Sequence, residues 1–290
     1  MNYKLSLTTT CTVLLSLVGI TSCSTTNASS ITAEPVLTPQ TVVMVHGLGA
    51  SSRQLQGFTD ELASEGCPTL LFDLPGFADG RSAETYTIDV MENDLSRRID
   101  ELSNDTPVVI LGNSMGGLLA MRYAIAHQDK VAGLILVAPA FWSEEGLPVS
   151  GQQLVTLADP QTPSDMRSYL DRVWSDASAV DIDLALREHR SVNVNGAIQD
   201  LAPSLATGEA GIPESVLQNL SVPVLIIQGT DDGIVPPALS QSLNGILPYS
   251  EFVLIEDAGH WPQMEQPDAF WQATSRLYDS TSCSIEAEAL

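Results

Sequence analysis

The stretch LGNSMGGLLA, residues 111–120, joins two segments of different character. The apolar run PVVIL at 107–111 is typical of a buried β-strand, and GGLLAMRYAIAH at 116–127 is typical of a helix. A serine between glycines at such a junction matches the pattern G-x-S-x-G, in which a sharp strand-to-helix turn exposes the serine hydroxyl. A tight turn without chemistry also favours small residues, so the rest of the chain must decide whether Ser114 is a nucleophile.

The alternation of strand and helix around this turn extends through most of the chain. Short apolar runs predict strands at 41–47, 69–73, 107–112, 131–138, 223–229 and 251–255. Amphipathic stretches between these runs predict helices near 53–64, 85–102, 115–127, 236–246 and 264–278. This alternation predicts an α/β fold with a mostly parallel sheet of about six core strands and helices on both faces.

One long segment after the fourth predicted strand contains no convincing strand of its own. In TPSDMRSYLDRVW at 162–174, the threonine suits a helix N-cap and the proline suits the first helical position. Two further helices are expected around 181–191 and 195–206. The sequence therefore predicts a helical cap, residues 140–212, inserted into a core that consists of residues 41–139 and 213–280.

The composition is that of a globular domain with a strongly acidic surface. The 290 residues include 36 Asp and Glu against 12 Lys and Arg, which gives a formal net charge of −24. Nucleic acids and anionic membrane surfaces are therefore poor partners for most of the surface. Beyond the leader the chain has Cys67 and Cys283, and the sequence leaves open whether they pair in an oxidising compartment or stay free.

A serine nucleophile needs a base to accept its proton, and the chain offers four histidines. His46 ends a predicted strand and is placed to shape the following loop. His127 closes a helix, where a cation is favourable without any catalytic role, and His189 lies in the cap among charged residues. His260, in the loop EDAGHWPQMEQP at 256–267, remains as the candidate base.

The candidate acid lies in IIQGTDDGIVPP at 226–237, just beyond a predicted strand. An acid should accept a hydrogen bond from the far nitrogen of the imidazole and so orient it. Asp231 and Asp232 both lie at the carboxyl end of the sheet, where loops build the sites of open α/β folds. The residues themselves do not decide whether Asp231 or Asp232 is the acid.

From Thr41 to about Tyr278 the chain resembles the α/β-hydrolase fold family. The motifs that carry the resemblance are His46–Gly49, Asp73–Gly76, Gly112–Gly117, Gly229–Pro236 and Ala258–Pro262. The resemblance implies a triad of Ser114, Asp232 and His260, because the second aspartate of G-x-D-D-x-x-V-P is the acid in the family. It also implies an oxyanion hole formed by the backbone amides of Leu48 and Met115.

Two departures from the family pattern concern the pocket and the sheet. The stretch DLPGFADGRS at 73–82 alters the usual loop, which affects pocket shape rather than the triad. The first two strands of the family are missing or reduced.

The resemblance also indicates which class of reaction the protein catalyses. GNSMGG at 112–117 is similar to bacterial family V lipases and esterases, and also to meta-cleavage product hydrolases. The latter carry a Ser-Gly-Pro-Gly type of loop where this chain reads LGAS at 48–51. We therefore expect a carboxylesterase or lipase that acts on a small-molecule ester or lipid, without metal or organic cofactor. The alternatives are a carbon–carbon bond hydrolase or lactonase on the same triad, and, more distantly, a non-catalytic binding lipoprotein.

The first 23 residues are typical of a targeting segment, with the sequence MNYKLSLTTTCTVLLSLVGITSC. The apolar stretch within them is too short for a membrane helix. Its end, ITSC at 20–23, resembles the lipobox of bacterial lipoproteins. The resemblance implies a signal peptide at 1–22, lipidation of Cys23, and anchoring to a membrane, with Ser24 favouring the outer membrane. The alternative is a secreted or periplasmic protein. We further expect a flexible tether at 23–40 and a C-terminal tail at 281–290.

Overall fold

The computed structural model describes residues 39–102, 105–140, 143–145, 150–193 and 195–285. The expected signal peptide, Cys23 and nearly all of the tether lie outside these described residues. Among the described residues, no helix is both long enough and apolar enough to cross a membrane.

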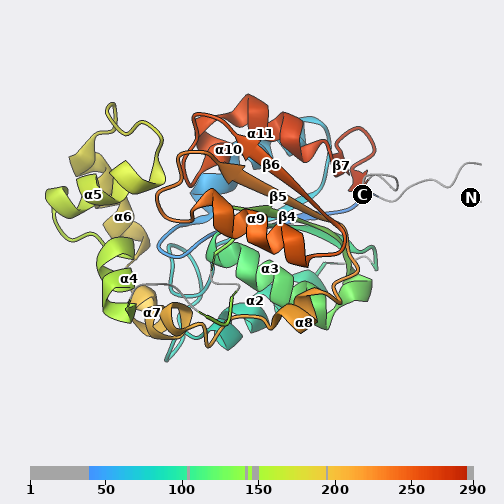
Figure 1. The fold of residues 1–290 in the computed structure, drawn as a ribbon, viewed down its shortest axis with the longest axis horizontal. Coiled ribbons are helices and arrows are strands. Elements are labelled where there is room, and N and C mark those ends of the chain that lie inside the picture. Colours follow the sequence, from blue (N-terminus) through green and yellow to red (C-terminus); the bar gives the residue numbers. More distant parts are fainter. Residues whose placement is uncertain (1–38, 103–104, 141–142, 146–149, 194, 286–290) are drawn as a thin grey trace, which may run out of the picture. The chain divides into compact units, whose positions relative to one another are not determined.

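A six-stranded parallel sheet forms the centre of the described fold, in the order β2-β1-β3-β4-β5-β6 (Figure 1). The strands are β1 (Val42–Val45), β2 (Thr69–Leu71), β3 (Val108–Asn113), β4 (Val131–Val137), β5 (Val224–Gly229) and β6 (Ser250–Ile255). All six coincide with the apolar runs of the sequence, and the expected α/β-hydrolase architecture is confirmed.

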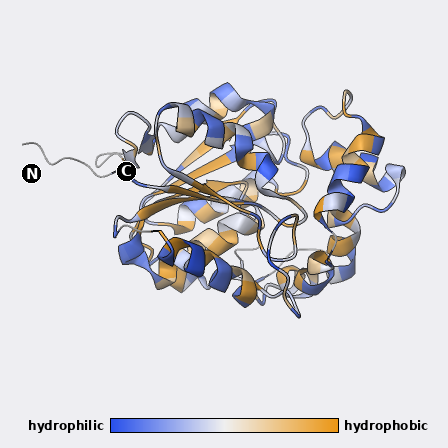
Figure 2. Ribbon diagram, turned by 180° about the vertical axis from the view of Figure 1, so that it is seen from behind, coloured by the Kyte–Doolittle hydropathy of each residue, from blue (hydrophilic) through white to orange (hydrophobic). Residues whose placement is uncertain are grey.

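Helices pack on both faces of this sheet. The core helices are η1 (Ser52–Leu55), α1 (Gln56–Ser64), α2 (Ile88–Asp100), α3 (Met115–Ala126), η2 (Gln128–Lys130), α8 (Glu214–Leu217), α9 (Pro237–Ile246), α10 (Pro262–Glu265) and α11 (Pro267–Thr274). Successive strand residues point to opposite faces, so Val43 and Val45 of β1 belong to the apolar cluster that includes residues of α2, α3 and α9. Val42 and Met44 belong to the cluster on the other face, which includes residues of α1 and α11. Figure 2 shows the resulting apolar strands between helices with polar outer surfaces.

The cap follows β4 and consists of α4 (Gly151–Ala158), α5 (Pro163–Val173), α6 (Ile182–Val192) and α7 (Ala197–Thr207). Thr162 and Asp165 form a reciprocal capping box at the start of α5, which satisfies two backbone N–H groups there. Met166, Tyr169 and Val173 of α5 then pack on Leu186 of α6 and on Trp261 of the core. The cap is thus attached to the core through a shared apolar cluster.

Two predicted segments at the C-terminal end differ from the structure. The single helix expected at 264–278 is split into α10 and α11, because Pro267 cannot donate a helical hydrogen bond and Gln266 before it is not helical. Residues 281–285 of the expected tail belong to the fold. They pair β8 (Ser284–Ile285) with β7 (Tyr278–Asp279), and Cys283 forms a disulfide with Cys67.

The end of the expected tether is also held in place. The backbone N–H of Gln40 donates to the carbonyl of Cys283, and its side chain accepts from the N–H of Ile285. Gln40 therefore joins the β7–β8 hairpin rather than a free linker.

Candidate active site

Ser114 lies in the turn between β3 and α3, with backbone angles of φ 56° and ψ −117°. A non-glycine residue at positive φ is strained, and such strain is held in place by tight packing around it. A side chain at Gly112 would place its Cβ 2.3 Å from the carbonyl oxygen of Gly116, and one at Gly116 would meet the carbonyl of Val45 at 2.2 Å. Both glycines of the motif are therefore required by the close approach of the backbone.

His260 and Asp232 form a direct pair beyond the ends of β6 and β5. The Nδ1 of His260 is 2.8 Å from Oδ2 of Asp232, and both side chains are buried. Oδ1 of Asp232 accepts hydrogen bonds from the backbone N–H groups of Ile234 and Val235, each at 2.8 Å. The carboxylate thus fixes the ring and requires the proton on Nδ1, which leaves Nε2 available as a base.

The structure distinguishes the two adjacent aspartates. Asp231 is exposed, and its carboxylate accepts a hydrogen bond from the hydroxyl of Ser175 at 2.6 Å. Asp232 alone contacts the imidazole of His260, so the geometry favours Asp232 over Asp231 as the orienting acid.

The backbone amides of Leu48 and Met115 are the expected oxyanion donors. Met115 is the first residue of α3, where N–H groups lack intrahelical partners and the helix dipole favours negative charge. Neither amide donates a hydrogen bond to another described residue. Both therefore remain available to an oxygen that develops negative charge.

Ser114 and His260 line the same small chamber beneath the cap, whose volume is about 40 Å³. The structure has no direct hydrogen bond between these two described side chains, and such bonds often tighten only when substrate binds. A larger cleft of about 250 Å³ adjoins the chamber. The residues shared by the two spaces are Ala50, Tyr169 and Trp261.

The outer cleft is mainly apolar and lies between the cap and the core. Its lining includes Met166, Leu170 and Trp174 of the cap, together with Met264 of the core. His189 also lines it, and burial lowers the pKa of this imidazole below its ordinary value. Because Met166 also packs within the cap, one apolar face serves both the cap and the cleft.

Three polar residues near the pair were not singled out from the sequence. Gln228 of β5 donates to Oδ2 of Asp232 at 2.8 Å and accepts from Ser240. The amide of Asn113 donates to the carbonyls of Val137 and His260. Gln228 could have been noticed, because a buried amide that ends an apolar strand requires hydrogen-bond partners. Glu265, the third, bonds to the loop of His260.

The side chain of His46 holds two loops together. Its Nε2 accepts the backbone N–H of Leu74 at 2.9 Å, and Nδ1 lies 2.8 Å from the carbonyl of Gly47. It thereby joins the loop of Leu48 to the loop after β2, as expected from the sequence. Burial lowers the pKa of His46 and favours its neutral form.

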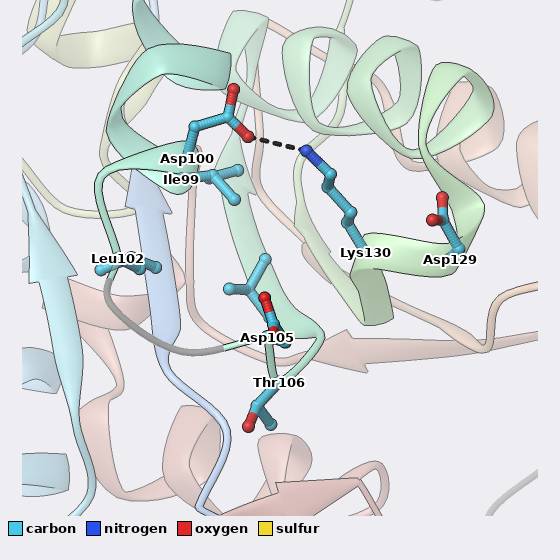
Figure 3. Close-up of a pocket in the computed structure, with 8 residues that line it drawn as sticks. Ile99, Asp100, Leu102, Asp105, Thr106, Asp129 and Lys130 are labelled. Atoms are coloured by element: carbon cyan, nitrogen blue, oxygen red, sulfur yellow. Dashed lines mark hydrogen bonds and ion pairs between the residues drawn. The ribbon is translucent and has the colours of Figure 1, made fainter.

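Another hollow, of about 280 Å³, lies at the opposite end of the sheet, near the starts of β3 and β4 (Figure 3). Its described lining includes Lys130, which reaches across to Asp100 at 2.7 Å, as well as Asp105 and Asp129. Exposed ion pairs of this kind contribute little to stability, because solvent screens their charges. The described residues contain no group of three His, Cys, Asp or Glu side chains arranged to hold a metal ion.

The family model of the alpha/beta hydrolase fold matches residues 40–267, and the chain belongs to this family. Among curated proteins, the pimeloyl-[acyl-carrier protein] methyl ester esterase of Neisseria meningitidis is 28% identical over 242 residues, which are 79% of this chain and 90% of that protein. The esterase of the same name from Salmonella newport is 25% identical over 248 residues, covering 82% of this chain and 94% of that protein.

Solved structures with the same fold include hydrolases of different kinds. A thermophilic esterase from Thermogutta terrifontis has a TM-score of 0.68 and 26% identity, and the match covers 83% of this chain and 93% of that chain. A meta-cleavage product hydrolase from Pseudomonas fluorescens IP01 also has a TM-score of 0.68, with 23% identity, over 80% of this chain and 88% of that chain.

Proposed function

We propose that this α/β hydrolase is a serine carboxylesterase that uses Ser114, His260 and Asp232. The observation that carries the proposal is the buried His260–Asp232 pair at 2.8 Å, whose His260 lines the same chamber as the strained Ser114. The similarity to methyl ester esterases and to the Thermogutta esterase supports an ester as the substrate.

In the proposed reaction, Ser114 Oγ attacks the carbonyl carbon of the ester while His260 Nε2 accepts the hydroxyl proton. The amides of Leu48 and Met115 donate to the oxyanion of the tetrahedral intermediate. Collapse of this intermediate breaks the ester C–O bond, and His260 gives its proton to the departing alcohol. Water then attacks the acyl-enzyme while His260 accepts one of its protons. Collapse of the second tetrahedral intermediate breaks the bond between the acyl carbon and Ser114 Oγ, His260 returns the proton to Ser114, and the carboxylic acid is released. No step requires a metal or cofactor.

The two cavities favour an ester with a small alcohol and an apolar acyl group. The chamber beside Ser114, of about 40 Å³, is much smaller than the adjoining cleft, so it suits the smaller of the two groups that an ester carries. The adjoining cleft of about 250 Å³, lined by Met166, Trp174 and Trp261, suits an acyl chain of intermediate length. We therefore propose methyl or ethyl esters of medium-chain acids as the substrate class.

The test is the release of acid from methyl esters, from acetate to palmitate, measured by titration at constant pH. The proposal expects turnover by the wild type, with an optimum at intermediate chain length, and none by a folded Ser114→Ala variant. Activity that persists in Ser114→Ala would remove Ser114 from the mechanism. A folded protein that cleaves only ring-fission diketones or lactones would replace the esterase with one of those hydrolases.

We also propose that the protein is exported and anchored through lipid on Cys23, on the strength of the lipobox-like ITSC at 20–23. A Cys23→Ser variant should move from the membrane fraction to the soluble fraction. Continued membrane fractionation of this variant would contradict lipidation.

A further inference from the structure

One carboxylate bridges the loop of His260 and the cap. Oε1 of Glu265 accepts the backbone N–H of Gly259 at 2.9 Å and that of Trp261 at 3.4 Å. Its other oxygen, Oε2, accepts the N–H of Ser175, just beyond α5 of the cap, at 2.7 Å. The two residues that flank His260 are therefore held by one side chain, which also holds the cap.

The end of α5 makes matching contacts with the loops of both the base and the acid. The N–H of His260 itself donates to the carbonyl of Val173 at 2.7 Å. The N–H of Gly233, next to Asp232, donates to the carbonyl of Arg172 at 2.9 Å. Arg172 and Val173 thus connect to the loops of both Asp232 and His260 through backbone hydrogen bonds, whose geometry does not depend on side-chain rotamers.

Partial burial of the Glu265 carboxylate costs free energy unless hydrogen bonds stabilise its charged form. The carboxylate is half-buried, and burial raises its pKa, whereas the three backbone N–H groups favour the charged form. Hydrogen bonds to a charged acceptor are stronger than those between neutral groups. A partly buried carboxylate that receives three amides from two segments is thus suited to fixing their relative position.

We propose that Glu265 is a positioning residue, which fixes the His260 loop and ties it to cap residues 172–175 so that the imidazole faces Ser114. The proposal rests on the proposed esterase function for its kinetic consequence. Glu265 does not line the chamber or the cleft, so its effect is transmitted through the backbone of the His260 loop.

The decisive variant is Glu265→Gln, which preserves the shape of the side chain. An amide keeps one acceptor oxygen and turns its NH₂ group toward a backbone N–H, so one side of the bridge is lost. A small displacement of a base costs up to about 100-fold in rate. We expect kcat for a methyl ester to fall about 10- to 100-fold, while KM changes by less than about twofold, because substrate contacts remain.

The matched control is Glu92→Gln on α2. Glu92 is also partly buried, and its carboxylate bonds to Arg122 at 2.6 Å, remote from the chamber and the cleft. The same substitution there removes a charge and hydrogen bonds, and we expect wild-type kcat and KM. An equal loss of kcat in both variants would show a general loss of stability and would overturn the positioning role.

A second pair of variants tests the cap side of the bridge without changing Glu265. Ser175→Pro removes the donated N–H, and the extended backbone of Trp174 suits the residue before a proline. Ser175→Ala keeps this N–H and loses only the hydroxyl bond to Asp231. We expect kcat of the proline variant to be at least about fivefold lower than that of the alanine variant, which is a small fraction of the loss that a displaced base can cause. Equal kcat values in the two variants would overturn the proposal.

Hydrogen exchange provides a readout that does not depend on the substrate. In Glu265→Gln, the peptide that contains Ser175, the peptide that contains Gly259, or both should exchange faster than in the wild type, whereas peptides of β3 should not change. Unchanged exchange at both amides would overturn the bridge even if the protein proves to be an esterase. If Ser114→Ala retained activity, the esterase proposal would fail and the exchange result would still decide the bridge.

Discussion

Replacing Asp232 with asparagine tests the proposed acid with a single-atom change. The carboxylate receives four hydrogen bonds at 2.8 Å, from His260, Gln228 and the N–H groups of Ile234 and Val235. Asparagine preserves the size but replaces one acceptor oxygen with a donor. If its oxygen stays with the two backbone amides, its NH₂ group faces the imidazole of His260.

The size of the expected loss of kcat depends on the tautomer that the His260 imidazole adopts in this variant. An NH₂ donor opposite Nδ1 stabilises the tautomer that carries its proton on Nε2, and this nitrogen then cannot accept the proton of Ser114. We expect kcat to fall about 10⁴-fold, which corresponds to about 5.5 kcal/mol in the activation free energy. Loss of charge-assisted hydrogen bonds should also lower the free energy of unfolding by about 1.5–3 kcal/mol.

The assay compares Asp232→Asn with Asp231→Asn, using methyl ester hydrolysis and urea unfolding of each variant. Asp231 is exposed and bonds to Ser175, so its variant should keep kcat within about threefold of the wild type, which is less than 1 kcal/mol. A folded Asp232→Asn with more than a tenth of wild-type kcat, or a larger loss in Asp231→Asn, would show that Asp232 is not the acid that orients His260.

The remaining predictions concern stability, measured by urea unfolding. Gly116→Ala should lower the free energy of unfolding by about 3 kcal/mol, because its Cβ meets a carbonyl at 2.2 Å, whereas Gly57→Ala, with open space around it, should raise it by about 0.5–1 kcal/mol; similar effects would contradict the packing. Reduction of the Cys67–Cys283 disulfide, which spans 216 residues, should cost about 3–5 kcal/mol, and no effect of reductant would be inconsistent with the bond. Burial lowers the folded-state pKa of His189 below 6.5. The stability that the neutral imidazole contributes is therefore fully present above pH 6.5 and is lost as the pH falls through the folded-state pKa. The fall in stability from pH 7 to pH 5 should therefore be smaller in His189→Gln, and parallel curves would argue against it.

The sheet and the turn of Ser114 were predictable because their signals are local. Strands buried on both faces must be apolar along their whole length, as VVMV in β1 is, and the glycines around Ser114 are required by backbone contacts within a few residues. The break at Pro267 was also encoded locally, since proline rarely continues a helix, and the prediction of one helix there was wrong.

Other features depend on contacts that a single sequence does not encode. The two residues of β8 form a strand through pairing with β7 and through a disulfide to a cysteine 216 residues away. Glu265 looks like an ordinary polar residue on a short helix, and its role depends on an amide 90 residues earlier in the chain. The choice between Asp231 and Asp232 required either a family resemblance or the contact with His260 that the structure shows.

Covalent labelling shows directly whether Ser114 is the nucleophile of an acyl-enzyme mechanism. The wild type and Ser114→Ala would be treated with a fluorophosphonate and analysed by peptide mass spectrometry. The proposed mechanism predicts stoichiometric labelling of the wild type at Ser114, complete loss of esterase activity on labelling, and no labelling of Ser114→Ala. Labelling at another serine with loss of activity, or an unlabelled wild type that hydrolyses methyl esters, would contradict it.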